Sequence, residues 1–214
     1  MPVAPASYLS NQVKVAVGTL YVAPLGTTEP SGVSGAWPTT PAPGWIALGY
    51  TDQGSELDFG PTTTDVTVEE EVYPVFTGID TYTAKMTFVL AEPTAFNLII
   101  ALNGGVPGPQ NPTATSMQTA ISGGVKVEPP TPGAENRVMI GWDALPKAST
   151  GSTGGDPFGR LICRQCFQTG QVKRVMRRGN NKAMFACEFN LEKPPTAQPY
   201  AFFMNNSMLG TVVS

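Results

Sequence analysis

Residues 65–91 read DVTVEEEVYPVFTGIDTYTAKMTFVLA, and this stretch decides the fold class. Alternate side chains from Tyr82 to Leu90 are apolar, and Thr83, Lys85 and Thr87 lie between them. Strict alternation over this length is typical of a β-strand with one buried face. The stretch therefore predicts a half-buried strand rather than a helix.

The segment 66–76 alternates in the same way and places Thr67, Glu69 and Glu71 on one face. We predict that a turn at 77–80 joins the two segments as a long hairpin. Because all of these polar positions oppose apolar faces, we expect them to lie on an exposed or interface surface.

The last third of the chain repeats this pattern. Strands are predicted over 160–168, 171–178 and 182–191, and the last has alternate apolar residues from 183 to 191. It ends in LEKP, much as the earlier strand ends in LAEP. Two similar hairpins related by an internal repeat explain this echo, and so does chance similarity between two amphipathic strands.

One helix is predicted between these blocks. Thr94 is a suitable N-cap, Phe96, Ile99 and Ile100 share one face, and the helix ends near Asn103. Shorter strands are predicted over 12–25, 45–50, 57–59, 124–127 and 137–142, and Gly60 and Pro61 are expected to end the strand at 57–59. The expected organisation is a mainly β domain over 13–193 with loops at 26–44, 104–120 and 146–159, flanked by arms at 1–12 and 194–214.

Composition supports a β-rich structural protein. Hydrophobic residues make up 41% of the chain and charged residues only 14%, while Gly (23) and Pro (21) punctuate short strands. The net charge of −3 does not suit a dedicated nucleic-acid binder. Neither a secretory signal nor a membrane-spanning run is recognisable, so we expect a soluble protein made inside the cell, with no membrane partner.

Charge is segregated along the chain. No Lys or Arg lies between Val15 and Ala84, where acidic residues are frequent, and no acid lies between Pro157 and Cys187, where basic residues are frequent. The acidic and the basic segment can neutralise each other inside the fold or between copies of the chain. Copies that join head to tail form rings or filaments. The interface prediction therefore comprises Lys173, Arg174, Arg177, Arg178 and Lys182 on one side, and Asp65 and Asp80 on the other.

Catalytic chemistry has little support. The chain has no histidine, and Cys163, Cys166 and Cys187 are too few for a zinc site. On a regular strand the first two thiols would point to opposite faces, so we interpret all three as small buried hydrophobes. The acidic triplet at 69–71 is interpreted as a solvated or interface face rather than a pair of catalytic carboxylates. We predict no enzyme, no metal site and no cofactor.

Several stretches resemble the major tail tube protein of long-tailed, siphovirus-type bacteriophages. They are GWIALGYTDQG at 44–54, the alternating segment 65–90, the helix at 94–103, and TGQV at 169–172 leading to RRGNNKA at 177–183. The resemblance covers most of the chain from about 13 to 193.

This resemblance implies a β-sandwich with one flanking helix, whose long hairpins join in a multi-subunit β-barrel around a lumen. Six subunits would form a ring, and stacked rings would form a virion tail tube that conducts double-stranded DNA during ejection without specific binding. The expected lumen-facing residues are Thr67, Glu69, Glu71, Thr83, Lys85 and Thr87. A tape-measure protein in the lumen and tail terminator and distal tail proteins would be partners, with synthesis in the host bacterial cytoplasm.

Two other functional classes stay open on the sequence. One is a β-sandwich decoration or adhesion module on a virion or cell surface. The other, weaker alternative is a cysteine- or carboxylate-dependent enzyme. Rings or tubes of the purified protein in electron micrographs would favour the tube over both.

Overall fold

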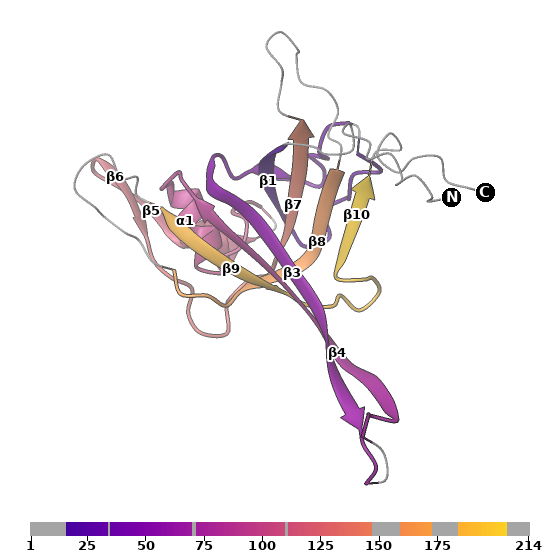
Figure 1. Cartoon of the computed structure of the whole chain (residues 1–214). Helices are drawn as coiled ribbons and strands as arrows, with labels where there is room; N and C mark the ends of the chain where they lie inside the picture. Colours follow the sequence, from indigo (N-terminus) through magenta and orange to yellow (C-terminus); the bar gives the residue numbers. More distant parts are fainter. Residues whose placement is uncertain are drawn as a thin grey trace.

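The computed structural model describes residues 16–33, 35–69, 72–109, 111–146, 159–172 and 184–204. The protein is mainly β (Figure 1). Its elements are β1 Ala16–Pro24, β2 Ile46–Ala47, β3 Thr51–Val66, β4 Phe76–Leu90, α1 Ala95–Ala101, α2 Pro112–Ser116, β5 Gln118–Ile121, β6 Gly124–Val127, β7 Val138–Pro146, β8 Gly159–Gln168, β9 Phe185–Leu191 and β10 Tyr200–Met204.

One antiparallel sheet holds most of the strands. It has the order β2-β1-β7-β8-β9-β4-β3, and β10 also pairs with β8. Along one edge of β8, β10 pairs with residues 159–163 and β9 pairs with residues 166–168. The sheet therefore changes direction along β8, so that β3, β4 and β9 run obliquely to β1, β7 and β8 (Figure 1).

The main hydrophobic core lies between these two parts of the sheet, which is the arrangement of a β-sandwich. Met86 and Phe88 of β4 and Phe189 of β9 contribute from one side. Leu20 of β1 and Ile140 of β7 contribute from the other. The apolar faces predicted for 82–90 and 183–191 are thus the core-facing sides of β4 and β9, although Tyr82 is exposed and residue 183 lies outside the described part.

The predicted helix is confirmed as α1. The Thr94 side chain accepts a hydrogen bond from the Asn97 backbone N–H at 3.1 Å, which is the expected N-cap contact. Asn103 has a φ of 58° just beyond the helix, a left-handed conformation that asparagine tolerates at a helix C-terminus. A second helix, α2, was not predicted and lies within the expected loop 104–120.

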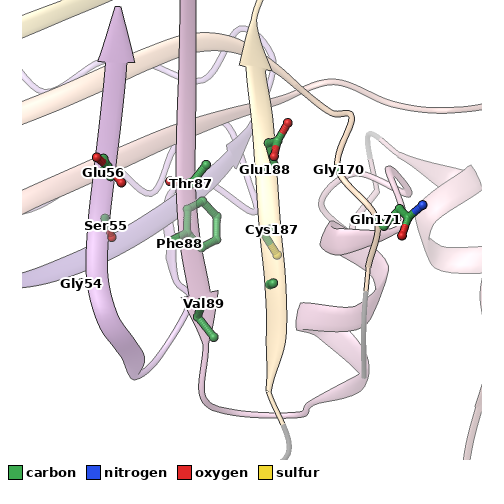
Figure 2. A pocket seen from close by; sticks show the side chains of 11 residues that line it. Gly54, Ser55, Glu56, Thr87, Phe88, Val89, Gly170, Gln171, Cys187 and Glu188 are labelled. Carbon is green, nitrogen blue, oxygen red and sulfur yellow. The ribbon is translucent and has the colours of Figure 1, made fainter. Parts of the chain in front are cut away.

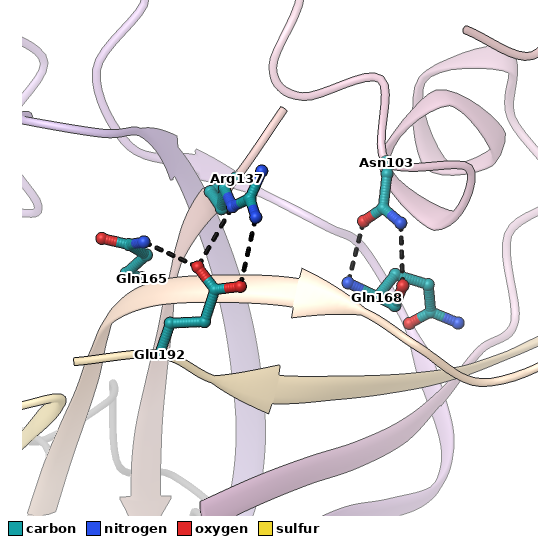
Figure 3. A network of polar contacts seen from close by, with 5 residues as sticks. All are labelled: Asn103, Arg137, Gln165, Gln168 and Glu192. Carbon is teal, nitrogen blue, oxygen red and sulfur yellow. Dashed lines mark hydrogen bonds and ion pairs between the residues drawn. The ribbon is translucent and has the colours of Figure 1, made fainter. Parts of the chain in front are cut away.

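Polar contacts hold the end of α1 and the end of β9 against β8 (Figure 3). Asn103 donates to the Gln168 carbonyl and accepts from the Gln168 backbone N–H, both at 2.8 Å. Glu192 accepts from Arg137 at 3.1 Å and from Gln165 at 2.7 Å. These hydrogen bonds from Arg137 and Gln165 lower the pKa of the Glu192 carboxyl below its ordinary value, with the Arg137 bond as the largest cause.

The long segment 26–44 covers the outer face of β1, β7 and β8. Trp37 is buried there against Trp45 and is stacked on Tyr21, with ring centroids 4.6 Å apart in each pair. The Trp37 indole N–H donates to Asp143 at 2.7 Å. An apolar ring and a satisfied N–H explain why this tryptophan folds back onto its own subunit. Through Trp37, the segment 26–44 is therefore held against the outer face of β1, β7 and β8.

Of the expected arms, the structure describes only part. Residues 1–12 lie outside the described part, and so do residues 205–214. Residues 200–204 form β10, which pairs with the first half of β8. The expected loop 146–159 also lies almost entirely outside the described residues.

Candidate functional site

The candidate site is the hairpin of β3 and β4, which projects from the body of the subunit (Figure 1). Its strands pair from Thr51 opposite Leu90 to Val66 opposite Phe76, with register shifts near Asp52 and near Thr62. The outer half has no sandwich layer over it, and its side chains are nearly all exposed. Such a projection contributes little to the subunit's own core.

The position predicted for the turn of this hairpin was wrong. Residues 77–80 are part of β4, and the connection between the strands runs over 67–75. The strand that pairs with β4 is 51–66, where Gly60 and Pro61 had suggested that a strand ends. Pro61 lies in β3, the last strand of the sheet, where proline is better tolerated because one side of the strand pairs with no other described strand.

Charged side chains from β3, β4 and β9 lie close together on the outer face of these three strands. Glu56, Thr87 and Glu188 lie in one row across the three strands. Figure 2 shows these three side chains beside an open pocket of about 590 Å³. With strand spacings of about 4.8 Å, the Cα atoms of Glu56 and Glu188 lie about 10 Å apart. Asp58 and Lys85 form the next row.

Lys85 does not make this face basic, because its Nζ lies 3.2 Å from Glu188. Three carboxylates of the face, those of Glu56, Asp58 and Glu188, thus accompany one ammonium group. We name Glu56, Asp58, Lys85, Thr87 and Glu188 the acidic face. Sequence reasoning missed Glu56, Asp58 and Glu188, because it did not recognise that β3 and β9 pair with β4.

The predicted lumen-facing residues separate into two groups in the structure. Thr83, Lys85 and Thr87 lie on the outer side of β4, in register with Gly60, Asp58 and Glu56. Thr67 and Glu69 lie beyond the last residue pair of the hairpin, in the connection at its end. Glu71 lies outside the described residues.

The predicted acidic interface residues both lie on the outer half of the hairpin. Asp65 accepts a hydrogen bond from Thr77 at 2.7 Å, and Asp80 accepts one from Thr64. Both carboxylates are exposed and lack a cationic partner among the described residues. The predicted basic partners, Lys173, Arg174, Arg177, Arg178 and Lys182, lie outside the described residues.

Part of the basic block has an intramolecular role. Arg160 is 2% exposed and forms a two-hydrogen-bond ion pair with Asp143, at 2.6 and 3.0 Å. Arg164 pairs in the same way with the half-buried Glu29, at 2.6 and 3.0 Å. The opposite charges therefore cancel partly inside the fold, and only the remaining cations are available to a second copy.

The three cysteines are free and buried. Cys163 and Cys166 both lie in the main core, so the expectation that they point to opposite faces was wrong. The register with β7 shifts between Val138 and Ile140, and this irregularity turns both thiols inward. Burial raises the pKa of Cys166 well above its ordinary value and that of Cys187 to about 12, so these two thiols are not poised as nucleophiles.

A large set of exposed apolar side chains marks the outer half of the hairpin. Val72, Tyr73 and Phe76 are 93%, 79% and 64% exposed. Sequence reasoning did not single them out, because alternation alone does not tell which apolar face has a partner. Contiguous exposed apolar surface of this kind is typical of a protein–protein contact.

The family of the protein follows from a comparison with known families. The family model described as phage tail tube protein matches residues 6–120, just over half of the chain. The chain belongs to this family. As a phage tail tube protein it has a structural role in the virion tail. The matched region includes β1 to β4, and therefore the whole projecting hairpin.

A search of curated proteins found no match. Across the described ranges, no helix is both long and apolar enough to cross a bilayer.

Proposed function

We propose that copies of this tail tube protein form stacked hexameric rings around a channel, and that double-stranded DNA passes through this channel during ejection. The family assignment supports assembly into a tube with other tail proteins. The projecting β3–β4 hairpin supports a shared barrel, since no other described part of the subunit covers its outer half. Among the described strands, β3 also has only one neighbour, so its other edge can pair with a second subunit.

The acidic face is the surface that we assign to the channel wall. DNA binds proteins mainly through cations that displace counterions from its phosphates. A wall with three carboxylates and one neutralised ammonium group per subunit offers no such exchange, so DNA is repelled and moves freely. Thr83, Lys85 and Thr87 fit this wall together with Glu56, Asp58 and Glu188, whereas Thr67 and Glu69 at the hairpin's end fit a contact between subunits.

The proposal extends to the partners of the tube. A tape-measure protein would occupy the lumen during assembly, and tail terminator and distal tail proteins would bind the two ends. The protein would be made in the host bacterial cytoplasm and act without catalysis or cofactor. Pairing of Lys173, Arg174, Arg177, Arg178 and Lys182 with Asp65 and Asp80 of the next subunit remains a prediction.

Electron microscopy of the purified protein tests the assembly. Six-fold rings or tubes are expected as concentration rises. A protein that stays monomeric at high concentration would contradict the proposal and favour a decoration or adhesion module.

A charge reversal tests the channel wall. In virions carrying Glu56→Lys, each six-fold ring would gain six cations in the channel, and we expect DNA ejection in vitro to slow at low salt and recover at high salt. Glu128→Lys is the matched control, because Glu128 is also an exposed acid but follows β6, away from the hairpin. Ejection of the Glu56→Lys virions at the control rate in low salt would refute the wall assignment.

A further inference from the structure

We propose that the end of the β3–β4 hairpin of one copy seats in a groove at the base of the same hairpin in a second copy. This inference rests on the proposed self-assembly and names the two surfaces that meet. We call residues 62–69 and 72–80 the hairpin tip. The base groove is the hollow of about 810 Å³ lined by Phe59, Pro61, Tyr82, Leu191, Pro199 and Tyr200, among others.

The hairpin tip has the character of an inserting element. Its most exposed apolar side chains, Val72, Tyr73 and Phe76, lie at the far end of the two-stranded hairpin. Valine, tyrosine and phenylalanine in such a position add large apolar area at little conformational cost. Among the described residues, no other part of the same subunit covers these three side chains, since each is more than half exposed.

The base groove has the character of a receiving surface. The rings of Phe59 and Tyr200 lie 5.8 Å apart and form part of its wall. Tyr82, which also lines the groove, is 76% exposed. Aromatic and proline side chains that surround an open hollow are typical of a site that takes side chains of a partner.

The tip cannot reach the groove of its own subunit. Pro61 lines the groove, and β3 extends from there to Val66, with one register shift after Thr62. Five residues of extended strand span about 17 Å. The hairpin also points away from the body of the subunit (Figure 1). The occupant must therefore belong to another copy, and a contact between two different surfaces joins copies head to tail.

Charge supports this pairing. Lys193 lines the base groove and is exposed. Within the described ranges, every other Lys or Arg forms an ion pair, and Lys193 has no acidic partner. The hairpin tip carries Asp65, Glu69 and Asp80, which have no cationic partner there. The unpaired cation of the base groove and the unpaired acids of the hairpin tip attract each other, so charge favours the same contact between tip and groove.

Two variants separate the surfaces. The tip variant carries Val72→Asp and Tyr73→Asp, and the groove variant carries Tyr82→Asp and Lys193→Glu. All four positions are exposed, so far-UV circular dichroism and the melting temperature should match those of the wild type. The matched control carries Ile121→Asp and Val125→Asp, which place two acids on the exposed β5–β6 hairpin instead.

Each variant alone should self-associate at least about thirtyfold more weakly than the control in sedimentation experiments, the effect of losing a central aromatic contact. An equimolar mixture of the two should form a 1:1 complex and stop there. One intact tip and one intact groove remain in the mixture, and they can meet only once. Self-association of either variant at the control level, or a mixture that stays monomeric, would overturn the inference.

A cross-linking experiment identifies the contact directly. Photoreactive p-benzoylphenylalanine at position 73 should attach to residues 191–200 or 81–84 of another copy in assembled wild-type background. Attachment within the same copy, to residues 205–214, or to a different surface would overturn the inference. These failures leave rings in the micrographs and are thereby distinguished from failure of the proposed function, in which the wild type itself would not assemble.

Discussion

The substitution Asp143→Asn removes the negative charge from the most deeply buried ion pair of the described residues. Asp143 accepts three hydrogen bonds, two from Arg160 and one from the Trp37 indole. An asparagine side chain has one acceptor oxygen and one donor amide, so it cannot accept on both sides. The guanidinium would keep its hydrogen bonds to the carbonyls of Gly32 and Gly35, but it would lose at least one of its two bonds to residue 143 and the charge opposite it.

Removing one partner of a buried pair costs about 3–5 kcal/mol, because the other charge stays buried without compensation. Arg160 is 2% exposed, so this range applies without a discount for solvent screening. With a urea dependence of about 1–3 kcal/mol per molar, the unfolding midpoint should fall by about 1–5 M. The segment 26–44 should loosen first, since both Trp37 and the two carbonyls that bind Arg160 belong to it.

Urea unfolding of the dilute protein, followed by tryptophan fluorescence and by circular dichroism, measures this change. Glu29→Gln is the matched control, because Arg164 binds Glu29 with the same two-bond geometry at a partly exposed site. That pair should be worth about 0.2–1 kcal/mol. A loss from Asp143→Asn no larger than that from Glu29→Gln would refute the argument from burial.

Three further outcomes are expected. Gly141→Ala should destabilise the fold by about 1–3 kcal/mol in urea unfolding, because its new Cβ would overlap the buried rings of Trp37 and Trp45. In the control Gly60→Ala the new Cβ meets open space, so the free energy of unfolding should stay within about 1 kcal/mol of the wild type. Glu192 has a lowered pKa in the folded state, so its stabilising effect is present above the ordinary pKa of 4.5 and is lost as pH falls through the folded pKa. The difference in free energy of unfolding between the wild type and Glu192→Gln should therefore shrink between pH 6 and pH 3. A difference that stays constant over this range would contradict the argument. Cys187 should react with a thiol reagent at pH 8 only after unfolding, and rapid labelling of the native protein at this cysteine would show that the core opens there.

Those parts of the fold that depend on local pattern were predictable from the sequence. The alternation of β4 and β9 identified their core-facing sides, because a buried face imposes its period directly on the strand. The sequence predicted both ends of α1, at Thr94 and near Asn103, since helix ends depend on residues within one turn. These features need no knowledge of distant partners.

Features set by distant partners were not predictable. The hairpin turn was misplaced because 66–76 also alternates, and only pairing with 51–66 decides which segment is β3. The inward direction of both Cys163 and Cys166 depends on a register shift against β7. The intramolecular roles of Arg160 and Arg164 depend on acids 17 and 135 residues away in sequence.

For the candidate site, the sequence singled out the residues of β4 but not those of β3 and β9. Thr83, Lys85 and Thr87 alternate visibly with apolar neighbours. Glu56, Asp58 and Glu188 join them only through strand pairing, which no local pattern encodes.

Pro61 on the free edge of β3 has a consequence for the protein before it is incorporated into a virion. A newly made subunit carries a 16-residue open strand, which is a template for uncontrolled fibril growth. A proline lacks the donor that a continuous cross-β ladder requires, so stray pairing along this edge is interrupted at residue 61. Its position thus protects free subunits from forming insoluble deposits before they are incorporated.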